Sequence, residues 1–433
     1  MKSRITLSAQ RGAAALIVTM LLFFGMLLAA VFVNRNLVFE QRISANQYRS
    51  TQAFEAAEAG LEWALSQLNN TQTIGADCLA STAAGAPTFR ERYLSFQKAT
   101  SNFTPNTWAS ASVALPLQPT CVRGATGWSC SCPAQGHPVL SAPSSAMPTP
   151  AFSLQFFAVP KAGMVRVVAS GCSSLKGACL PGSGSGTADA GARTEVTFGL
   201  MPGLRTPPAA ALTARGAVDV GSAAISVRNS DPATGVTLNA GGAINAPQAR
   251  IAAPAGTAAD ASLAANDTAL ADLGADALFA TYFGIDKARW RDQPMVRRLA
   301  CTADCASALQ TALDAGGPTP LVWIDGSLTL AGPLTLGSAA RPVVIVASGA
   351  VQLRGDIAVH GLIYGAAASW AGTSAVGAAG GAATGAVLHG ALISEAGYTG
   401  NGTPDLQYDA DVLATLRTNS GSFARVSGSW RDF

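Results

Sequence analysis

The chain has 433 residues, enough for two or three domains, and 49% of them are hydrophobic while only 12% are charged. This apolar content excludes general disorder, and 45 Gly and 23 Pro residues are typical of a turn-rich protein with extended strands. The net charge of +3 equals the three positive charges of Lys2, Arg4 and Arg11, so the remaining chain is balanced. No net basic charge is left there to bind nucleic acid.

Residues 13–33 form an uncharged apolar run that only Thr19 and Gly25 interrupt. About 20 residues of this kind are enough to span a bilayer as a helix. The positive charges of residues 1–12 precede the run, so the positive-inside rule places them in the cytoplasm. The pattern predicts a single-pass membrane protein whose C-terminal part lies across the membrane from the cytoplasm.

The end of the apolar run indicates where the chain is processed. An ordinary signal peptide is cut behind its apolar run, at a site with small side chains. Here the run ends in the bulky residues Val31-Phe32-Val33, and Ala29-Ala30-Val31 is a weak alternative. We therefore expect residues 1–12 to be a leader peptide that is removed after Gly12, while the apolar run is kept.

One long helix is predicted over residues 13–69, about 85 Å in length at 1.5 Å per residue. Its outer half projects from the membrane and carries apolar residues at helical spacing, which predicts a stripe packed on a globular domain: Phe54, Ala57, Leu61, Leu65 and Leu68. Three glutamates fall on another face, which we expect to be solvated: Glu55, Glu58 and Glu62.

Residues 70–205 are predicted to form a globular domain in two parts. Residues 70–150 are rich in Ser, Thr, Ala and Pro and hold four cysteines, which favours an irregular, disulfide-pinned region. Three strand-like runs follow, separated by turn signals: Phe152–Val159, Met164–Ser170 and Arg193–Leu200. These runs suit a small antiparallel sheet against the long helix, so the predicted fold class is α+β.

Short strand-like runs with frequent Gly predict a large, mainly-β C-terminal domain over residues 206–433, with a helical insertion near 259–315. Two of its segments resemble each other, Val359-His360-Gly361-Leu362-Ile363-Tyr364 and Leu388-His389-Gly390-Ala391-Leu392-Ile393. Short repeated strands with Gly corners favour a β-solenoid, in which each coil buries its apolar face on the next. A second β-sandwich is the alternative.

An even number of cysteines in an exported chain favours disulfides over metal ligands, because the chain has only three His and no CxxC. The local candidates are Cys172 with Cys179 and Cys301 with Cys305. The remaining four cannot be paired from the sequence: Cys78, Cys121, Cys130 and Cys132.

Three carboxylates precede a short helix-like run near the C-terminus: Asp405, Asp409 and Asp411. We interpret them as helix-start residues that accept free backbone N–H groups, and a calcium site, which needs six or more oxygens, is the alternative. His360 and His389 occupy matching places in the repeated segments, which favours packing or a turn over catalysis. There is no GxSxG or HExxH motif, and we predict no catalytic residue and no cofactor.

The N-terminal region resembles that of PilX-type minor pilins of type IV pili. The resemblance covers about residues 10–70. It rests on Arg11-Gly12-Ala13-Ala14-Ala15-Leu16-Ile17-Val18, the apolar run, and Gln52-Ala53-Phe54-Glu55-Ala56-Ala57-Glu58-Ala59-Gly60-Leu61-Glu62-Trp63-Ala64. It implies that prepilin peptidase cuts between Gly12 and Ala13 and that the new Ala13 amine is methylated. It also implies assembly with other minor pilins and a major pilin, without catalytic activity.

One position departs from the pattern of this family. Most pilins carry glutamate at mature position five, and counting from Ala13 that position is Ile17. The family's glutamate pairs with the terminal amine of the subunit already above, because a buried charge without a partner is costly. A subunit without it needs no neighbour above. The departure therefore implies a place at the pilus tip and a role in starting assembly. The large C-terminal domain supports the same place, because a bulky domain fits an end of the filament better than its packed shaft, and there we expect it to face a tip adhesin or another surface in adhesion and twitching motility.

Two alternatives stay open at this point. Minor pseudopilins of type II secretion systems share the helix, and those at the tip also tend to lack the glutamate. A membrane-anchored solenoid enzyme acting on polysaccharide is the other alternative.

Overall fold

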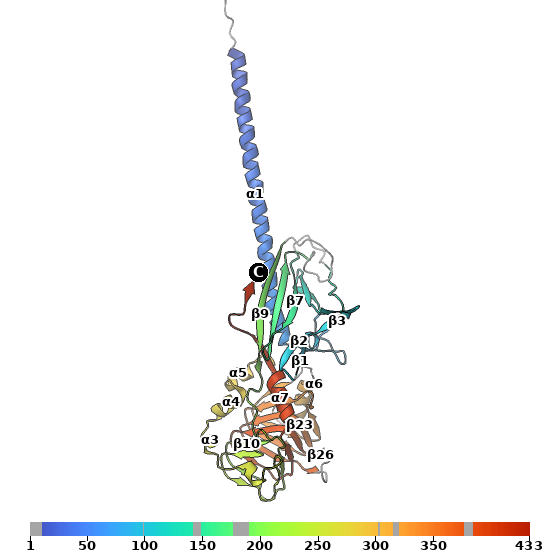
Figure 1. The fold of residues 1–433 in the computed structure, drawn as a ribbon, viewed down its shortest axis with the longest axis vertical. Helices are drawn as coiled ribbons and strands as arrows, with labels where there is room; N and C mark the ends of the chain where they lie inside the picture. Colours follow the sequence, from blue (N-terminus) through green and yellow to red (C-terminus); the bar gives the residue numbers. More distant parts are fainter. Residues whose placement is uncertain are drawn as a thin grey trace, which may run out of the picture.

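The computed structural model describes residues 11–97, 99–141, 149–175, 190–301, 304–314, 320–375 and 384–433. Most of the leader, residues 1–10, and Cys179 lie outside these ranges. Figure 1 shows a long helix, α1 (Arg11–Leu68), that projects far beyond the rest of the chain. An antiparallel sheet lies beside its C-terminal end, and a larger β region lies beyond that sheet.

The helix α1 confirms the predicted long apolar N-terminal helix. It has 58 residues, about 87 Å at 1.5 Å per residue. Side chains 14–51 are exposed, and the first buried one is Ala53. Small residues bring the helix close to the sheet: a Cβ on Gly171 would lie 2.1 Å from the Ala53 carbonyl oxygen, so only glycine fits there. Burial of Leu61 and Leu68 then holds the helix on the sheet.

The sheet beside α1 is antiparallel throughout, with the order β30-β9-β8-β7-β5-β6 and with β31 also on β9. Its strands are β5 (Thr120–Arg123), β6 (Trp128–Ser131), β7 (Ala151–Ala158), β8 (Met164–Cys172), β9 (Gly191–Pro202), β30 (Gly421–Arg425) and β31 (Arg431–Asp432).

The two last strands correct the predicted domain division. Residues 206–433 were expected in one C-terminal domain, but β30 and β31 return to the sheet of the first domain and pair with β9. This pairing joins residues more than 200 positions apart, so nothing in the local sequence pattern signals it.

Residues 70–150 also contain more regular structure than the predicted irregular region. A capping box of Thr88 and Glu91 starts the short helix α2 (Phe89–Tyr93). Two antiparallel pairs follow: β1 (Leu94–Gln97) with β2 (Asn102–Pro105), and β3 (Thr107–Ser110) with β4 (Val113–Pro116). Each strand has four residues, too few for an alternating apolar pattern to stand out.

The C-terminal part is mainly β, and its strands pair in parallel in two sheets. The main path of the first sheet is β15-β12-β29-β27-β23-β21-β18-β17, and the second has the order β14-β11-β28-β24-β22-β19. In chain order the strands are β10 (Leu212–Ala214), β11 (Val218–Asp219), β12 (Ser226–Arg228), β13 (Leu238–Ala240), β14 (Ile244–Asn245), β15 (Arg250–Ala252), β16 (Leu263–Ala264), β17 (Val296–Ala300), β18 (Leu321–Asp325), β19 (Leu328–Ala331), β20 (Leu334–Leu336), β21 (Val343–Ala347), β22 (Val351–Arg354), β23 (Ile357–Gly365), β24 (Ala368–Ala371), β27 (Val387–Ser394), β28 (Tyr398–Thr399) and β29 (Asp405–Gln407). A small antiparallel pair, β25 (Ser374–Ala375) with β26 (Thr384–Gly385), stands apart.

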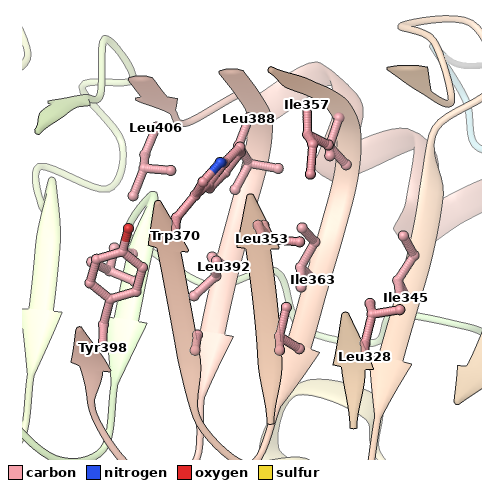
Figure 2. Packing of buried hydrophobic residues seen from close by; sticks show 14 of the residues in the cluster. Leu328, Ile345, Leu353, Ile357, Ile363, Trp370, Leu388, Leu392, Tyr398 and Leu406 are labelled. Carbon is pink, nitrogen blue, oxygen red and sulfur yellow. The ribbon is translucent and has the colours of Figure 1, made fainter. Parts of the chain in front are cut away.

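The core of this part lies between the two sheets, as Figure 2 shows. Strands in register place like residues above one another: Leu353 of β22 is aligned with Leu330 of β19 and with Trp370 of β24. All three are buried in the same cluster. Each strand therefore buries its apolar side chains on those of its neighbours, which is the main stabilising contribution of this region.

In the described residues of the C-terminal part there are five α-helices: α3 (Thr268–Ala271), α4 (Ala275–Phe283), α5 (Lys287–Arg291), α6 (Ala306–Asp314) and α7 (Ala410–Asn419). Aromatic residues of α4 and α5 pack on Trp323 and Tyr364, which stand on the outer side of the first parallel sheet. The predicted helical insertion near 259–315 thus contains helices, but β16 and β17 interrupt it because they join the parallel sheet.

A stacked glycine corner explains the two similar segments. Gly361 and Gly390 are aligned on β23 and β27, with φ of +153° and +137°. A Cβ on Gly361 would lie 1.9 Å from the Val343 carbonyl oxygen, and one on Gly390 equally close to the Gly361 oxygen. The chain bends here so tightly against its neighbour that only glycine is tolerated.

Candidate assembly surface and other candidate sites

The outer surface of α1 between Leu16 and Val33 is apolar and exposed. Leu16 is 61% and Phe23 is 69% exposed, although neither carries a polar atom in its side chain. Soluble proteins rarely expose a continuous apolar surface of this length. The helix is long and apolar enough to cross a membrane. This surface is therefore built for lipid or for other apolar helices.

Two residues of this surface, Thr19 and Ile17, show how apolar it is. The Thr19 hydroxyl donates to the Leu16 carbonyl oxygen at 2.9 Å, so it adds no unsatisfied donor. Ile17 is 58% exposed and lies among apolar side chains. The expected processing residues, Gly12 and Ala13, lie in the first turn of the helix backbone.

The acidic face of α1, the side that carries Glu40, Glu55, Glu58 and Glu62, is not simply solvated. Trp430 Nε1 donates to Glu58 Oε1 at 2.8 Å, and Arg425 pairs with Glu62 at 2.7 Å. The Trp430 ring also packs edge-on against Phe54, with ring centroids 6.4 Å apart. The returning C-terminal segment therefore contacts the helix face that was expected from the sequence to be solvated. These partners could not be found from local sequence.

The structure pairs most of the cysteines. Cys301 is bonded to Cys305, and the four that the sequence left unpaired form Cys78–Cys132 and Cys121–Cys130. Cys172 is disulfide-bonded, while its expected partner Cys179 lies outside the described residues.

The three C-terminal carboxylates lie at the start of α7 and in β29, where Asp409 and Asp405 stabilise the local backbone and side chains. Asp409 is the N-cap of α7 and accepts from the Val412 N–H at 2.9 Å. Asp405 is buried in β29, where it pairs with Arg228 and accepts from Gln407 Nε2 at 2.8 Å. Asp411 follows the cap in the first turn of α7. In the described ranges, no group of three or more His, Cys, Asp or Glu residues is arranged to hold a metal ion.

The two repeated histidines form a stacked pair on the parallel sheet. The His360 and His389 rings lie 4.5 Å apart and 14° from parallel. Burial lowers the pKa of both, and the positive charge that His360 can carry lowers the pKa of His389 further. The carboxylate of Asp409 raises both pKa values in part, whereas Arg228 lowers that of His389. The two rings therefore pack against each other in an environment that disfavours their protonation.

No curated relative matches the chain. Among solved structures, the chain is similar to the competence-associated pilin ComZ from Thermus thermophilus, at 13% identity over 89% of this chain and 98% of that one. The TM-score of 0.23 is too low for this likeness to carry an argument.

A family model gives the more specific result. The model described as PilX N-terminal matches residues 11–62, which include the exposed apolar surface, the acidic face and the first contacts with the sheet. This confirms the resemblance in the region where the sequence predicted it. Residues 11–62 are thus similar to the PilX-type N-terminal region of type IV pilins.

Proposed function

We propose that the chain is a minor pilin of the type IV pilus. Prepilin peptidase cuts between Gly12 and Ala13, the Ala13 amine is methylated, and residues 13–33 hold the protein in the inner membrane with its C-terminus in the periplasm. The PilX-type match over residues 11–62 and the exposed apolar surface of α1 support this proposal. On assembly the same surface packs among the helices of other minor pilins and the major pilin.

Within the pilus, the tip is the place that this chain fits best. The observation that carries this placement is Ile17, an exposed apolar residue where most pilins carry glutamate. A glutamate in an apolar helix bundle has to be paired, and its partner is the amine of the subunit above. Ile17 requires no such partner, so the subunit is free to start the filament.

The C-terminal part is interpreted as a β-solenoid that the tip subunit presents outward. Each strand of the second parallel sheet follows a strand of the first sheet in the chain, and strands of neighbouring coils pair in parallel register. Such a bulky unit fits an end of the filament better than its packed shaft. It offers a surface to a tip adhesin or to an external surface, which supports adhesion and twitching motility.

Immunogold labelling of wild-type pili, with antibody against residues 206–420, tests the placement. Gold at filament ends is expected, and gold spread along the shaft would refute the tip position.

Ile17→Glu should reduce incorporation of the protein into pili, because it adds an unpaired charge to the apolar surface. Deletion of the protein should impair twitching and leave protein secretion intact. The reverse outcome would indicate a type II secretion pseudopilin.

A further inference from the structure

The charged residues of α1 beyond the apolar run are sorted by sign. Residues 34–68 contain three arginines and four glutamates: Arg35, Arg42, Arg49, Glu40, Glu55, Glu58 and Glu62. At 3.6 residues per turn, spacings of seven keep the three arginines within about 40° of one another around the helix. The four glutamates fall within about 60° on the opposite side. We call the first set the arginine stripe and the second the acidic face.

The two faces are oriented differently relative to the sheet. The arginine stripe lies on the same side of α1 as Ala53, Ala57 and Ala64, which are buried against the sheet. Its residues precede the first buried position, so the stripe runs along the bare part of the helix and is exposed. The acidic face points away from the sheet. The helix therefore has a basic side and an acidic side, and three of the four glutamates lie beyond the arginines along its axis.

Among the described residues, the C-terminal segment contacts the acidic face and not the arginine stripe. Arg425 pairs with Glu62 and Trp430 donates to Glu58, so the C-terminal segment partly covers the acidic face. In the described structure, the Arg35 guanidinium lies over its neighbour Phe39, at 5.6 Å from the ring centroid, and no ion pair joins the arginine stripe to a carboxylate. The arginine stripe is therefore an exposed, positively charged surface.

We propose that the arginine stripe docks on an acidic helix face of the pilin subunit assembled directly beneath this one. The inference rests on the proposed function. Basic and acidic faces on opposite sides of one helix suit a heterologous contact, in which the basic side of each subunit meets the acidic side of the next. The offset from Arg42 to Glu58 is 16 residues, so a neighbour of the same design would be displaced by about 24 Å along the helix axis.

Charge and length favour a helix over lipid headgroups as the occupant. The stripe runs for about 21 Å along the axis of a helix that leaves the membrane, so only Arg35 stays near the bilayer surface. The partial cover of the acidic face by the C-terminal segment agrees with a position at the pilus tip. The basic side of the subunit faces the subunit beneath, and its own C-terminal segment partly covers its acidic side, so no subunit above is needed.

Charge reversal of the full-length protein in its host tests the docking. The triple variant Arg35→Glu, Arg42→Glu and Arg49→Glu should lower recovery of the protein in sheared pili by about tenfold or more, since like charges then face each other. The matched variant Arg35→Lys, Arg42→Lys and Arg49→Lys keeps the charge and should be recovered nearly as well as wild type. Equal amounts of all three proteins in the membrane fraction verify that the variants are made and inserted.

The outcomes separate this inference from the proposed function. If the wild-type protein is absent from pili, the proposed function fails. If wild type and the glutamate variant are recovered equally, the function stands and the docking inference is overturned.

Site-specific photo-crosslinking identifies the occupant. A benzophenone amino acid in place of Asn46 lies on the stripe side, and one in place of Ser44 lies on the opposite side of α1. The Asn46 position should yield an adduct with the acidic segment of another pilin's helix, and the Ser44 position should not. A phospholipid adduct alone, the same adduct from both positions, or none from Asn46 would overturn the proposal.

Discussion

Asn69 and Phe423 exchange two hydrogen bonds although 354 positions separate them. Asn69 Nδ2 donates to the Phe423 carbonyl oxygen at 2.9 Å, and the Phe423 N–H donates to Asn69 Oδ1 at 2.7 Å. The Asn69 side chain, just after the end of α1, thus pairs with both backbone groups of Phe423, as a neighbouring strand would. Arg90 supports the same strand from α2, where it donates to Gly421 O at 3.1 Å and lies over the Phe423 ring.

Asn69→Ala should destabilise the full-length protein by about 1–3 kcal/mol, because it leaves one donor and one acceptor of Phe423 unpaired. Thermal unfolding in detergent measures the loss. Asn70→Ala is the matched control, since Asn70 accepts only from the Gln72 N–H two residues away, and it should cost less than half as much. Equal losses would contradict the proposed role of the Asn69 bridge.

Gly361→Ala should be among the most damaging single changes, at about 4 kcal/mol or more, since the new Cβ would meet the Val343 carbonyl oxygen. Gly326→Ala separates the two causes of damage: Gly326 also has a positive φ, of +99°, but a Cβ there meets nothing within 4 Å. It should cost only about 1 kcal/mol, the conformational penalty alone. Comparable unfolding temperatures for the two variants would refute the stacked corner.

The His360–His389 pair should make stability fall in acid. Burial holds both pKa values below the ordinary 6.5, so below about pH 6.5 the unfolded chain binds more protons than the folded one. The stabilising contribution is therefore complete above this pH and is lost as the pH falls through the folded pKa values. Denaturant unfolding from pH 7.5 to 5 should show a steeper loss for wild type than for the double variant His360→Gln, His389→Gln. Identical slopes would contradict the prediction.

The disulfide Cys78–Cys132 should contribute more than Cys121–Cys130. The first closes a span of 54 residues and the second a span of 9. The loop-entropy relation gives about 4 kcal/mol for the first and about 3 kcal/mol for the second. Unfolding of the paired Ser variants of each bridge checks the order. A larger loss for the shorter bridge would show that loop closure does not dominate.

Local features of the chain could be predicted from the sequence. The apolar run, the helical spacing that continues to Leu68 and the position of Ile17 are all properties of neighbouring residues. The glycine corner was visible as a repeated His-Gly pair, although its tight contact with Val343 was not.

Long-range partners could not be predicted. The return of β30 to β9 and the bridge from Asn69 to Phe423 join distant segments whose own sequences fit several environments. The same holds for Glu58 and Glu62, which look like solvated residues until Trp430 and Arg425 are placed beside them. The arginine stripe was readable in the sequence, but its significance depends on which side of α1 the sheet covers.

Residues 13–33 are proposed to be a pilin polymerisation segment that is kept after cleavage ahead of it. Mass spectrometry of the N-terminus of the protein recovered from sheared pili tests it most directly. The expected chain begins at Ala13 and carries one N-methyl group. An intact Met1, or a chain cut after Ala29–Val31, would contradict it.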